Sequence, residues 1–538
     1  MEQCFDSSTH EFSARGAIPS RHRKQWQTAI LAAALVGSCL GVAPSARAAD
    51  PLLDLLLNKG MISEAEAAAV KAEADALRTN NLAADPTTMS APKSRWTMKS
   101  GHPGMELFGD LRLRVEDRKV TGAMGGDIEL QRLRYSARVG LRGEVMDDFY
   151  FGVRLDPSAN ARSAWLTLGA NSSSGTYQGP FGKSTASLNL GQLYLGWHGA
   201  DWFDITAGKM ANPLYTTSLV WDSDIAPEGF TEHFQYTVGE ADLFATFGQF
   251  LYQDPNPTKA SKGFFNLGYN SANLPFLLAW QGGVKYHLTK SLTLKIAPVL
   301  YTYSSHGVNL SGSGSSDFPG FAGTFVGQGS TNGINGAAAD YSGYPSGPYD
   351  GFAANQTGVN DLTVLEIPVE LNFKLDKINL QLFGDYAQNL DGGKRARAAF
   401  IAQQSALLSS SGLSPIPAPQ THDVHAYLVG VAIGNGEGRG PVSKKHEWEL
   451  RTSWQHVEQY ALDPNLLDSD FFEGRANLEG ICAALNYGLT DNLVGTLRYG
   501  YARRINEKLG TGGSNLDLPQ MNPIKNFSLL MLDLSLKF

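Results

Sequence analysis

Apolar and polar residues alternate along many short stretches of the chain beyond residue 105. In QRLRYSARVGLRGEV, residues 131–145, the apolar residues Leu133 and Tyr135 share one face with their neighbours two positions away, and the intervening arginines share the other face. A period of two is typical of a β-strand whose faces meet different surroundings. The alternation recurs up to the terminal LLMLDLSLKF, residues 529–538. The pattern predicts an all-β structure from residue 105 onward.

Short and long connections alternate between these segments. Tight turns such as 146–148 and 490–491 alternate with long polar connections such as 304–360. One connection, 434–446, stands where a tight turn is expected but is too long to be one. Counting gives 16 strands with all the long loops at one end, and the exact strand count around 231–252 stays open. An even number of strands with this asymmetry is typical of outer-membrane barrels. We therefore expect a transmembrane antiparallel β-barrel over residues 105–538.

The side chains on the two faces of each strand determine which face meets lipid and which meets the lumen. A membrane core satisfies backbone polar groups only if the strands close into a ring. Turning the four arginines of 131–145 toward lipid would cost on the order of 10 kcal/mol, at roughly 2 to 4 kcal/mol each near the midplane. The leucine-rich faces must therefore meet lipid, and the arginines must point into the lumen.

The N-terminal region carries a different pattern. Arg21, Arg23 and Lys24 precede an apolar run at 29–42, and the small-x-small triplet Ala46-Arg47-Ala48 follows. These features predict a secretory signal, residues 1–48, cleaved after Ala48. Capping residues and an alanine-rich stripe then predict a short periplasmic helical segment at 49–80, whose role stays open, and a polar linker at 81–104.

Composition excludes several classes of function. The net charge of -8 argues against a nucleic-acid partner, and once the predicted signal is removed only Cys482 would remain, so no intramolecular disulfide could form. The sequence contains no GxSxG elbow, Walker loop, HExxH or CxxC motif. We expect no enzyme activity, no cofactor and no metal site.

The lumen-facing charges are the candidate functional residues. Alternation places a basic wall on the first three strands, made of Arg112, Arg114, Arg132, Arg134, Arg138, Arg142 and Arg154. It places an acidic wall on the tenth and eleventh strands, made of Glu366, Glu370 and Asp385. Opposed walls would set a transverse field across the water and bias permeating ions. The alternative is that nearby acids such as Asp110, Glu116 and Glu144 neutralise the arginines.

Two loop sequences resemble a known family. The runs AGKMANPLYTTSLVWDSDIAPEGF, 207–230, and VEQYALDPNLLDSDFFEGRANLEG, 457–480, are similar to those of the putative porins of Gram-negative outer membranes. The resemblance implies that the third long loop, 211–230, folds into the barrel as a constriction. Its candidate residues are Trp221, Asp222, Asp224 and Glu228. The loop could instead lie across the rim.

The chain is thus expected to form a porin that passes small hydrophilic solutes and ions by diffusion through the outer membrane. An anion- or substrate-specific channel, for example for phosphate, and a barrel that acts as an adhesin or outer-membrane enzyme are the alternatives. Phe538, Leu536 and Leu534 resemble the signal read by the barrel-assembly machinery. Outer-membrane lipid and that machinery are the expected partners, and a homotrimer stays open.

Overall fold

The structure, a computed structural model, describes the chain from residue 105 to residue 538. The predicted signal at 1–48, helical segment at 49–80 and linker at 81–104 lie outside the described residues. Further residues not described are 124, 147, 159–163, 170–186, 253–275, 304–361, 395, 397–421, 437–441, 464–465, 508 and 512–522. The described part contains no helix long and apolar enough to cross a membrane.

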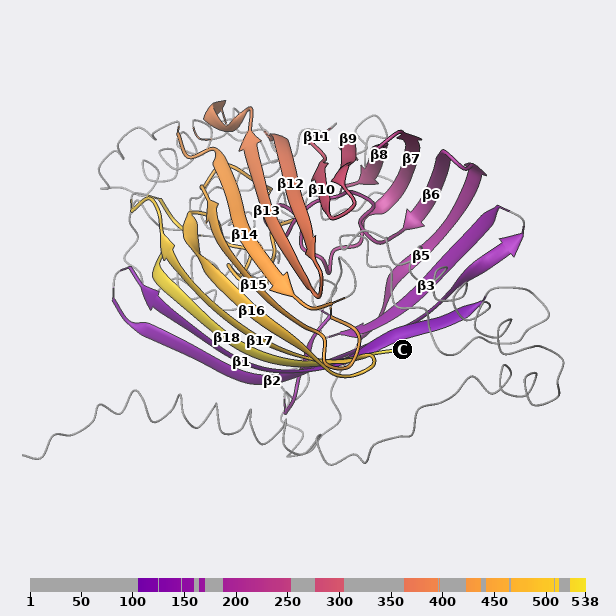
Figure 1. Ribbon diagram of the computed structural model, residues 1–538. Coiled ribbons are helices and arrows are strands. Elements are labelled where there is room, and N and C mark those ends of the chain that lie inside the picture. Colours follow the sequence, from indigo (N-terminus) through magenta and orange to yellow (C-terminus); the bar gives the residue numbers. More distant parts are fainter. Residues whose placement is uncertain are drawn as a thin grey trace, which may run out of the picture. The chain divides into compact units, whose positions relative to one another are not determined.

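Antiparallel strands make up nearly all of the regular structure (Figure 1). They are β1 (Glu106–Gly122), β2 (Asp127–Met146), β3 (Phe149–Ser158), β4 (Leu166–Thr167), β5 (Ser187–Ala200), β6 (Phe203–Lys209), β7 (Glu228–Val238), β8 (Ala241–Leu251), β9 (Phe276–Thr289), β10 (Leu292–Ile296), β11 (Val299–Tyr303), β12 (Thr363–Leu375), β13 (Ile378–Asn389), β14 (His425–Gly434), β15 (Trp448–Val457), β16 (Leu478–Thr490), β17 (Leu493–Arg504) and β18 (Ile524–Lys537).

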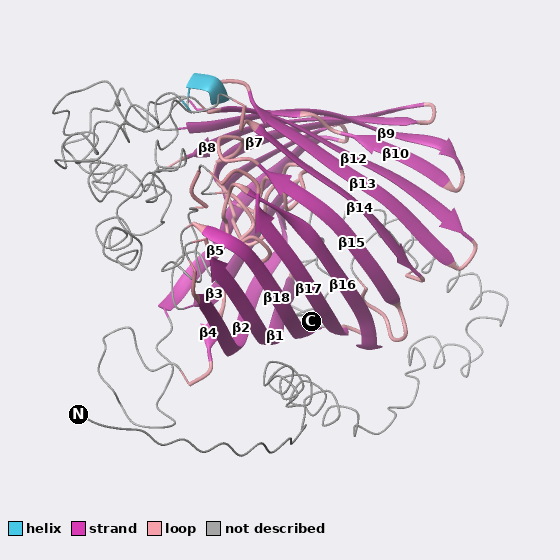
Figure 2. Ribbon diagram, turned by 90° about the vertical axis from the view of Figure 1, so that its left-hand side faces the viewer, coloured by secondary structure: helices cyan, strands magenta, loops and turns pink. Residues whose placement is uncertain are grey.

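The strands form a closed ring of 16. Each strand pairs with its neighbours in sequence, and β1 also pairs with β18. Two of the 18 segments do not occupy separate places, because β4 pairs with β2 beyond the end of β3 and because β10 and β11 both lie between β9 and β12. The predicted antiparallel barrel of about 16 strands is confirmed, and Figure 2 shows its tilted strands from the side.

The strand formed by β10 and β11 is interrupted at Ala297 and Pro298. Proline has no backbone N–H to give to the ladder, so it is tolerated where pairing is broken. Here the Pro298 carbonyl still accepts from Gly282 N at 3.1 Å, and the Gln281 side chain donates to the Ala297 carbonyl at 3.2 Å. A side-chain amide therefore repairs part of the broken ladder.

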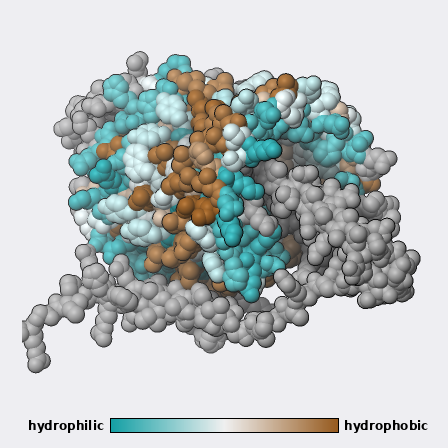
Figure 3. Space-filling view, in the orientation of Figure 1, coloured by the Kyte–Doolittle hydropathy of each residue, from teal (hydrophilic) through white to brown (hydrophobic). Residues whose placement is uncertain are grey.

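The two faces of the ring divide as the alternation predicts. On the outer face of β1, Leu111 and Leu113 are 50% and 43% exposed, and an apolar band crosses the outer surface in Figure 3. The alternating positions of β1 carry Arg112 and Arg114 inward, where they meet acidic side chains. The outer leucines are therefore suited to contact with lipid.

The last residue closes the ring against β1. Phe538 exchanges two backbone hydrogen bonds with Gly109, at 3.0 and 3.1 Å. A Cβ on Gly109 would lie 2.7 Å from the Phe538 ring, so glycine leaves the room that the ring occupies. Leu534 and Leu536 pair with Leu113 and Leu111. The terminal aromatic residue is thus built into the seam.

Aromatic side chains gather where β5, β6 and β7 approach their short turns. Trp202 lies 5.8 Å from Phe203 and 6.1 Å from Phe234, and Phe203 and Phe234 are 4.9 Å apart, all between ring centroids. Amphipathic rings favour the headgroup level of a membrane. This cluster is therefore suited to the headgroup level at this end of the strands.

Candidate constriction site

The connection between β6 and β7, residues 210–227, lies inside the ring and is named the first inner loop. Its Tyr215 is held by Gln281 of β9, which accepts from the Tyr215 N–H at 2.9 Å and donates to the Tyr215 carbonyl at 2.8 Å. The Gln281 side chain therefore imitates a neighbouring strand. The alternative path, across the rim, is not the one that the structure has.

Two threonines fasten the same loop to the acidic residues of β12 and β13. Thr216 Oγ1 donates to Glu366, which also accepts from the Tyr301 hydroxyl at 2.6 Å. Thr217 Oγ1 donates to Asp385 at 2.5 Å. A buried carboxylate without donors is costly, so these hydroxyls stabilise both the acids and the path of the loop.

The predicted acidic wall therefore does not line open water. Glu366, Glu370 and Asp385 are 0%, 5% and 4% exposed. Glu370 is occupied by the side-chain amides of Asn372 at 2.9 Å and Gln381 at 3.0 Å. These residues lie on the inner side of the ring, where the loop and neighbouring amides cover them.

The middle of the first inner loop packs as an apolar core inside the ring. Trp221 lies 6.1 Å from Phe250 and 6.3 Å from Tyr301, between ring centroids, and it is 4% exposed. Its Nε1 donates to the Ile225 carbonyl at 3.1 Å, which closes the turn. Trp221 thus shapes the loop rather than facing solute.

A second loop from the opposite side of the ring meets the first. This second inner loop, residues 458–477 between β15 and β16, buries Leu466 and Phe471 among other apolar residues. Asp222 of the first loop donates its N–H to the Leu466 carbonyl at 2.7 Å and accepts from Ser469 N at 3.1 Å and Ser469 Oγ at 2.8 Å. The lumen is therefore narrowed by two loops in mutual contact.

The tip of the first inner loop reaches the basic wall. Asp224 lies 3.3 Å from Arg138 and 4.0 Å from Arg112. Asp110 of β1 also pairs with Arg138, at 2.7 Å, and with Arg112, at 3.1 Å. Glu228 does not share this position, because it begins β7 and pairs with Lys209 at 2.6 Å with 58% of its side chain exposed.

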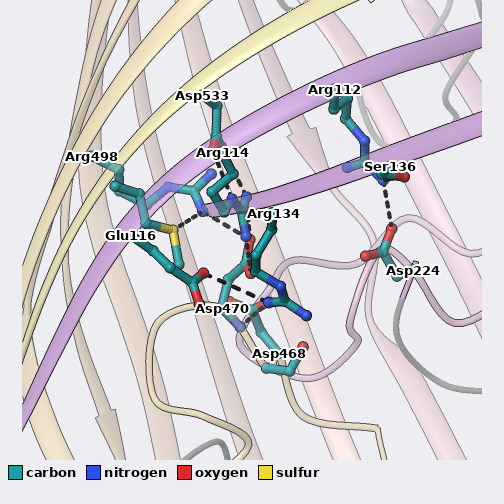
Figure 4. A network of polar contacts seen from close by, with 12 residues as sticks. Arg112, Arg114, Glu116, Arg134, Ser136, Asp224, Asp468, Asp470, Arg498 and Asp533 are labelled. Atoms are coloured by element: carbon teal, nitrogen blue, oxygen red, sulfur yellow. Dashed lines mark hydrogen bonds and ion pairs between the residues drawn. The ribbon is translucent and has the colours of Figure 1, made fainter. Parts of the chain in front are cut away.

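Arg114, with 3% of its side chain exposed, is the most enclosed member of the predicted wall. Figure 4 shows its polar contacts. Arg114 binds Asp533 of β18 with two hydrogen bonds, at 2.6 and 2.8 Å, and Asp470 of the second inner loop at 2.9 and 3.3 Å. Arg498 of β17 adds a contact to Asp470 at 2.9 Å. Bidentate guanidinium–carboxylate pairs fix geometry as well as charge, so this cluster anchors the second loop.

Three guanidiniums of the wall surround one indole. Trp165, just before β4, has the guanidinium carbons of Arg114, Arg112 and Arg134 at 4.1, 4.6 and 5.7 Å from its ring centroid. Cations are attracted to the face of an aromatic ring. Trp165 therefore spaces neighbouring arginines that would otherwise repel one another.

The remaining arginines of the wall also have acidic partners. Arg132 and Arg134 both contact Glu116, the latter at 3.6 Å. The other two pairs are Arg142 with Glu106, at 2.8 Å, and Arg154 with Asp156, at 2.6 Å. Every arginine of the predicted basic wall is thus paired with a nearby acid. The partner of Arg142 is Glu106 and not Glu144.

The carboxylates at the contact between the loops differ in acidity. Burial, together with neighbouring Asp222 and Asp470, raises the pKa of Asp468 to about 7, and burial beside Asp224 raises the pKa of Asp222 to about 6. Burial alone would raise the pKa of Asp470, but the Arg114 and Arg498 guanidiniums hold it well below its usual range. The loop contact therefore contains acids that titrate close to neutrality beside one that stays charged.

Sequence reasoning did not predict that the second inner loop turns inward, or that Asp470, Asp533 and Trp165 contact the basic wall. A signal was present, because the pairs Leu466-Leu467 and Phe471-Phe472 are unusually apolar for a polar surface loop. Within the part of the chain that the structure describes, no cluster of His, Cys, Asp or Glu is arranged to hold a metal ion. The site is built to position charges and restrict a passage.

The chain was compared with known proteins. A model of the family described as "Putative porin" matches residues 117–538. No curated protein matches the chain at a significant level.

Solved structures that resemble the fold include OprB of Pseudomonas putida, with 11% identity, a TM-score of 0.43 and coverage of 84% of this chain and 100% of that one. An anion-selective porin from Comamonas acidovorans has 10% identity, a TM-score of 0.37 and coverage of 81% and 99%. The channel DcaP of Acinetobacter baumannii has 11% identity, a TM-score of 0.35 and coverage of 83% and 100%.

Proposed function

The chain belongs to the putative porin family, and we propose that it works as a weakly selective diffusion channel of the outer membrane. Small hydrophilic solutes and ions pass through the lumen, the two inner loops restrict the passage, and the basic wall sets a mild preference for anions. A channel, rather than an enzyme, is the activity that the family and the ring of strands support.

The observation that carries this proposal is the course of the first inner loop. It is fastened to β12 and β13 through Thr216 and Thr217, and its tip meets β2 through Asp224 and Arg138. A loop that bridges opposite walls reduces the cross-section available to water and solutes. Channel selectivity follows from the width and the lining charges at such a point.

The preference for anions is expected to be mild because the guanidiniums are compensated. Every arginine of the predicted wall contacts a carboxylate, so the wall as a whole has little net field. Arg142 and Arg498 nevertheless have 26% and 27% of their side chains exposed. Both side chains can therefore meet a permeating anion, as can Arg451 of β15, which has 38% of its side chain exposed.

Planar-bilayer recording of the purified full-length protein tests the proposal. We expect stepwise current increases whose size is proportional to voltage. Silence at high protein input, with the protein shown to be folded by its β-rich circular dichroism, would contradict channel function. Conductance that saturates with one solute would favour the alternative, a substrate-specific channel.

The role of the basic wall is tested by selectivity. Arg134→Ala combined with Arg138→Ala leaves Glu116, Asp110 and Asp224 with fewer cationic partners, so the reversal potential in a salt gradient should shift toward cations. Arg503→Ala is the matched control, because Arg503 lies near the end of β17 with 69% of its side chain exposed. An unchanged potential in the double variant would remove the wall from the permeation path.

Export and assembly complete the proposal. Cleavage of residues 1–48 would deliver the chain to the periplasm, and Leu534, Leu536 and Phe538 would be read by the barrel-assembly machinery. A homotrimer is proposed as the assembled form. Mass spectrometry of the mature N-terminus and of the detergent-extracted complex tests these points separately.

A further inference from the structure

An acidic side chain lies on the outer side of β7, among apolar neighbours. Glu232 is flanked along its own strand by Phe230 and Phe234, whose side chains face outward and are 53% and 41% exposed. Its register partners on the adjoining strands are Ile205 of β6 and Phe247 of β8. The carboxylate therefore lies within an apolar part of the outer surface, which is the surface that meets lipid in a barrel.

This acid is held by an amide and not by a base. Glu232 accepts two hydrogen bonds from the side chain of Gln249, at 3.2 and 3.3 Å, and within the described part of the chain no basic side chain lies at ion-pair distance from it. Gln249 also faces outward, because Phe230 is its register partner. A charge on the lipid face destabilises a barrel. The Glu232–Gln249 pair is therefore better suited to contact with protein than with acyl chains.

The wall of the barrel is short beside this pair. β6 has 7 residues, fewer than the roughly 9–11 that a tilted strand needs to cross a membrane, whereas β5 has 14. The pairing of β5 with β6 ends at Leu193 and Lys209. Among the described residues, no strand pairs with Ser187–Gln192 of β5 on that side.

This edge of β5 is apolar on its outer face. Leu188 and Leu190, which lie beyond the end of β6, are 69% and 44% exposed. Sheet edges that are open to lipid do not occur within the hydrocarbon region, because their backbone groups would lack partners. The edge of β5 therefore requires a cover made of protein.

The outer face of β7 and β8 is also hollowed. A shallow apolar hollow of about 470 Å³ is lined by Trp202, Phe234, Tyr236, Leu243 and Ala245, among others. Ala245 is the register partner of both Phe234 and Gly282, so small residues lie between the larger rings. A hollow of this kind can receive a projecting side chain from another protein surface.

The same face carries features that complement the hollow and the acid. Phe247 and Trp280 stack with their ring centroids 3.8 Å apart, and Trp280 is 50% exposed. The indole N–H groups of Trp202 and Trp280 have no hydrogen-bond partner among the described residues, so they are available as donors to a carboxylate such as that of Glu232. In a closed ring of copies, one side of such a face meets the other side of the neighbour's face. The face is therefore able to complement a second copy of itself.

We propose that the outer face of β6, β7 and β8, the docking face, binds a second copy of this chain. The neighbouring copy covers the edge of β5, fills the hollow with apolar side chains and brings hydrogen-bond donors to Glu232. The inference rests on the homotrimer proposed above and assigns the surface through which its copies meet. The opposite side of the ring, at β16 and β17, then meets lipid.

Photocrosslinking in intact outer membranes tests which surface meets a second copy. The photoreactive residue p-benzoylphenylalanine replaces Tyr236, which is 67% exposed on β7, or in the matched control Tyr499, which is 51% exposed on β17. The first variant should yield an adduct of twice the mass of the chain, and the control should yield none. Adducts of the first variant with lipid alone, or with a different protein alone, would overturn the docking face. Double-mass adducts of equal yield at both positions would do the same.

A substitution at the acid distinguishes docking from contact with lipid. Glu232→Leu removes the acceptor from the docking face, so it should lower the association constant of the copies in detergent micelles about tenfold, as measured by sedimentation equilibrium. The barrel itself should resist denaturant at least as well as the unaltered protein, because leucine is suited to the lipid face. Tyr499→Leu is the control and should leave association unchanged. Association that does not respond to Glu232→Leu, in protein shown to be folded by circular dichroism, would overturn the proposal.

Bilayer recording separates this inference from the channel itself. Stepwise conductance from protein that stays monomeric at every concentration would contradict the docking face and leave the channel intact. Copies joined through position 236 without any conductance would contradict the channel and leave the docking face intact. An oligomer that is joined only through position 499 would preserve the homotrimer and overturn the docking face.

Discussion

The arginines of β1 to β3 and the carboxylates of β12 and β13 face the same lumen but are neutralised in different ways. The arginines meet carboxylates, as in the pairs of Arg114 with Asp533 and Asp470. Glu366 and Asp385 instead meet hydroxyl groups of Thr216, Thr217 and Tyr301. The partners of the basic wall come from five segments, namely β1, β3, β18 and the two inner loops. The acidic wall instead serves as the attachment for a loop.

This difference shows that the alternation of a strand determines which face a charge takes, but not whether water reaches it. A charge moved out of water must find partners, and either an opposite charge or a set of hydrogen-bond donors can supply them. The first inner loop and side chains of neighbouring strands provide the partners for the acidic wall here. Four predictions test or refine this comparison.

The largest effect is expected from Arg114→Ala on the basic wall. Because Arg114 is 3% exposed and joins two carboxylates, its removal should lower the free energy of unfolding by about 3–5 kcal/mol. Denaturant titration in detergent measures the loss. Arg142→Ala is the matched control, and its partly exposed pair with Glu106 should contribute only about 1 kcal/mol or less. Equal losses would mean that the enclosure of Arg114 has no energetic consequence.

The next effect concerns the attachment of the loop to the acidic wall. Thr216→Val with Thr217→Val deprives Glu366 and Asp385 of donors, at about 1–3 kcal/mol per buried group. Limited proteolysis within residues 211–227 should accelerate, and the unfolding free energy should fall. Thr246→Val is the control, because this buried hydroxyl shares its hydrogen bond with His233 Nδ1 of β7, at 2.9 Å, and not with the loop. Unchanged proteolysis would show that these hydroxyls do not hold the loop.

A smaller effect is expected from pH at the contact between the loops. The pKa of Asp468 is raised to about 7 and that of Asp222 to about 6, so the folded state binds protons more readily than the unfolded chain. Their contribution to stability should therefore be complete below about pH 4 and be lost as pH rises toward 7.

Hydrogen exchange at the Ser469 amide, which donates to Asp222, measures this contact. After correction for intrinsic exchange, its protection should be higher at pH 5 than at pH 8. Asp468→Asn should flatten much of that dependence. Protection that rises with pH would reverse the assigned direction.

The smallest effect separates two acids that the sequence placed together. Asp224→Asn removes a charge beside Arg138 and should shift the reversal potential slightly toward anions. Glu228→Gln removes an exposed partner of Lys209 and should change neither the potential nor, beyond about 0.5–1 kcal/mol, the stability. Equal shifts would place both acids on the permeation path.

Much of the barrel follows from the sequence because lipid imposes a strict rule. Arginine cannot face hydrocarbon at low cost, so the inward side of β2 and the count of 16 strands were predictable from alternation and turn spacing. The same reasoning placed Glu366 on the lumen side. It gave no information about Thr216, because a hydrogen bond between residues 150 positions apart depends on the path of the loop.

The inward path of the second inner loop was not predictable for the same reason. Alternation applies to strands, and the apolar pairs beginning at Leu466 and Phe471 lie outside any strand. Trp165 was also unpredictable, since its contacts require β4 to continue alongside β2 after β3 has ended. Apolar residues clustered in an otherwise polar connection are the sequence feature that would have indicated an inward path.

Gln281 connects the first inner loop to the wall of the barrel. One amide nitrogen donates both to the carbonyl of Tyr215 in the loop and to the carbonyl of Ala297 at the break between β10 and β11. A displacement of the loop is therefore transmitted to the wall of the barrel. Shortening the loop to widen the pore would also remove a contact that supports the barrel wall beside Pro298. The width of the pore and the rigidity of the wall therefore have to be redesigned together.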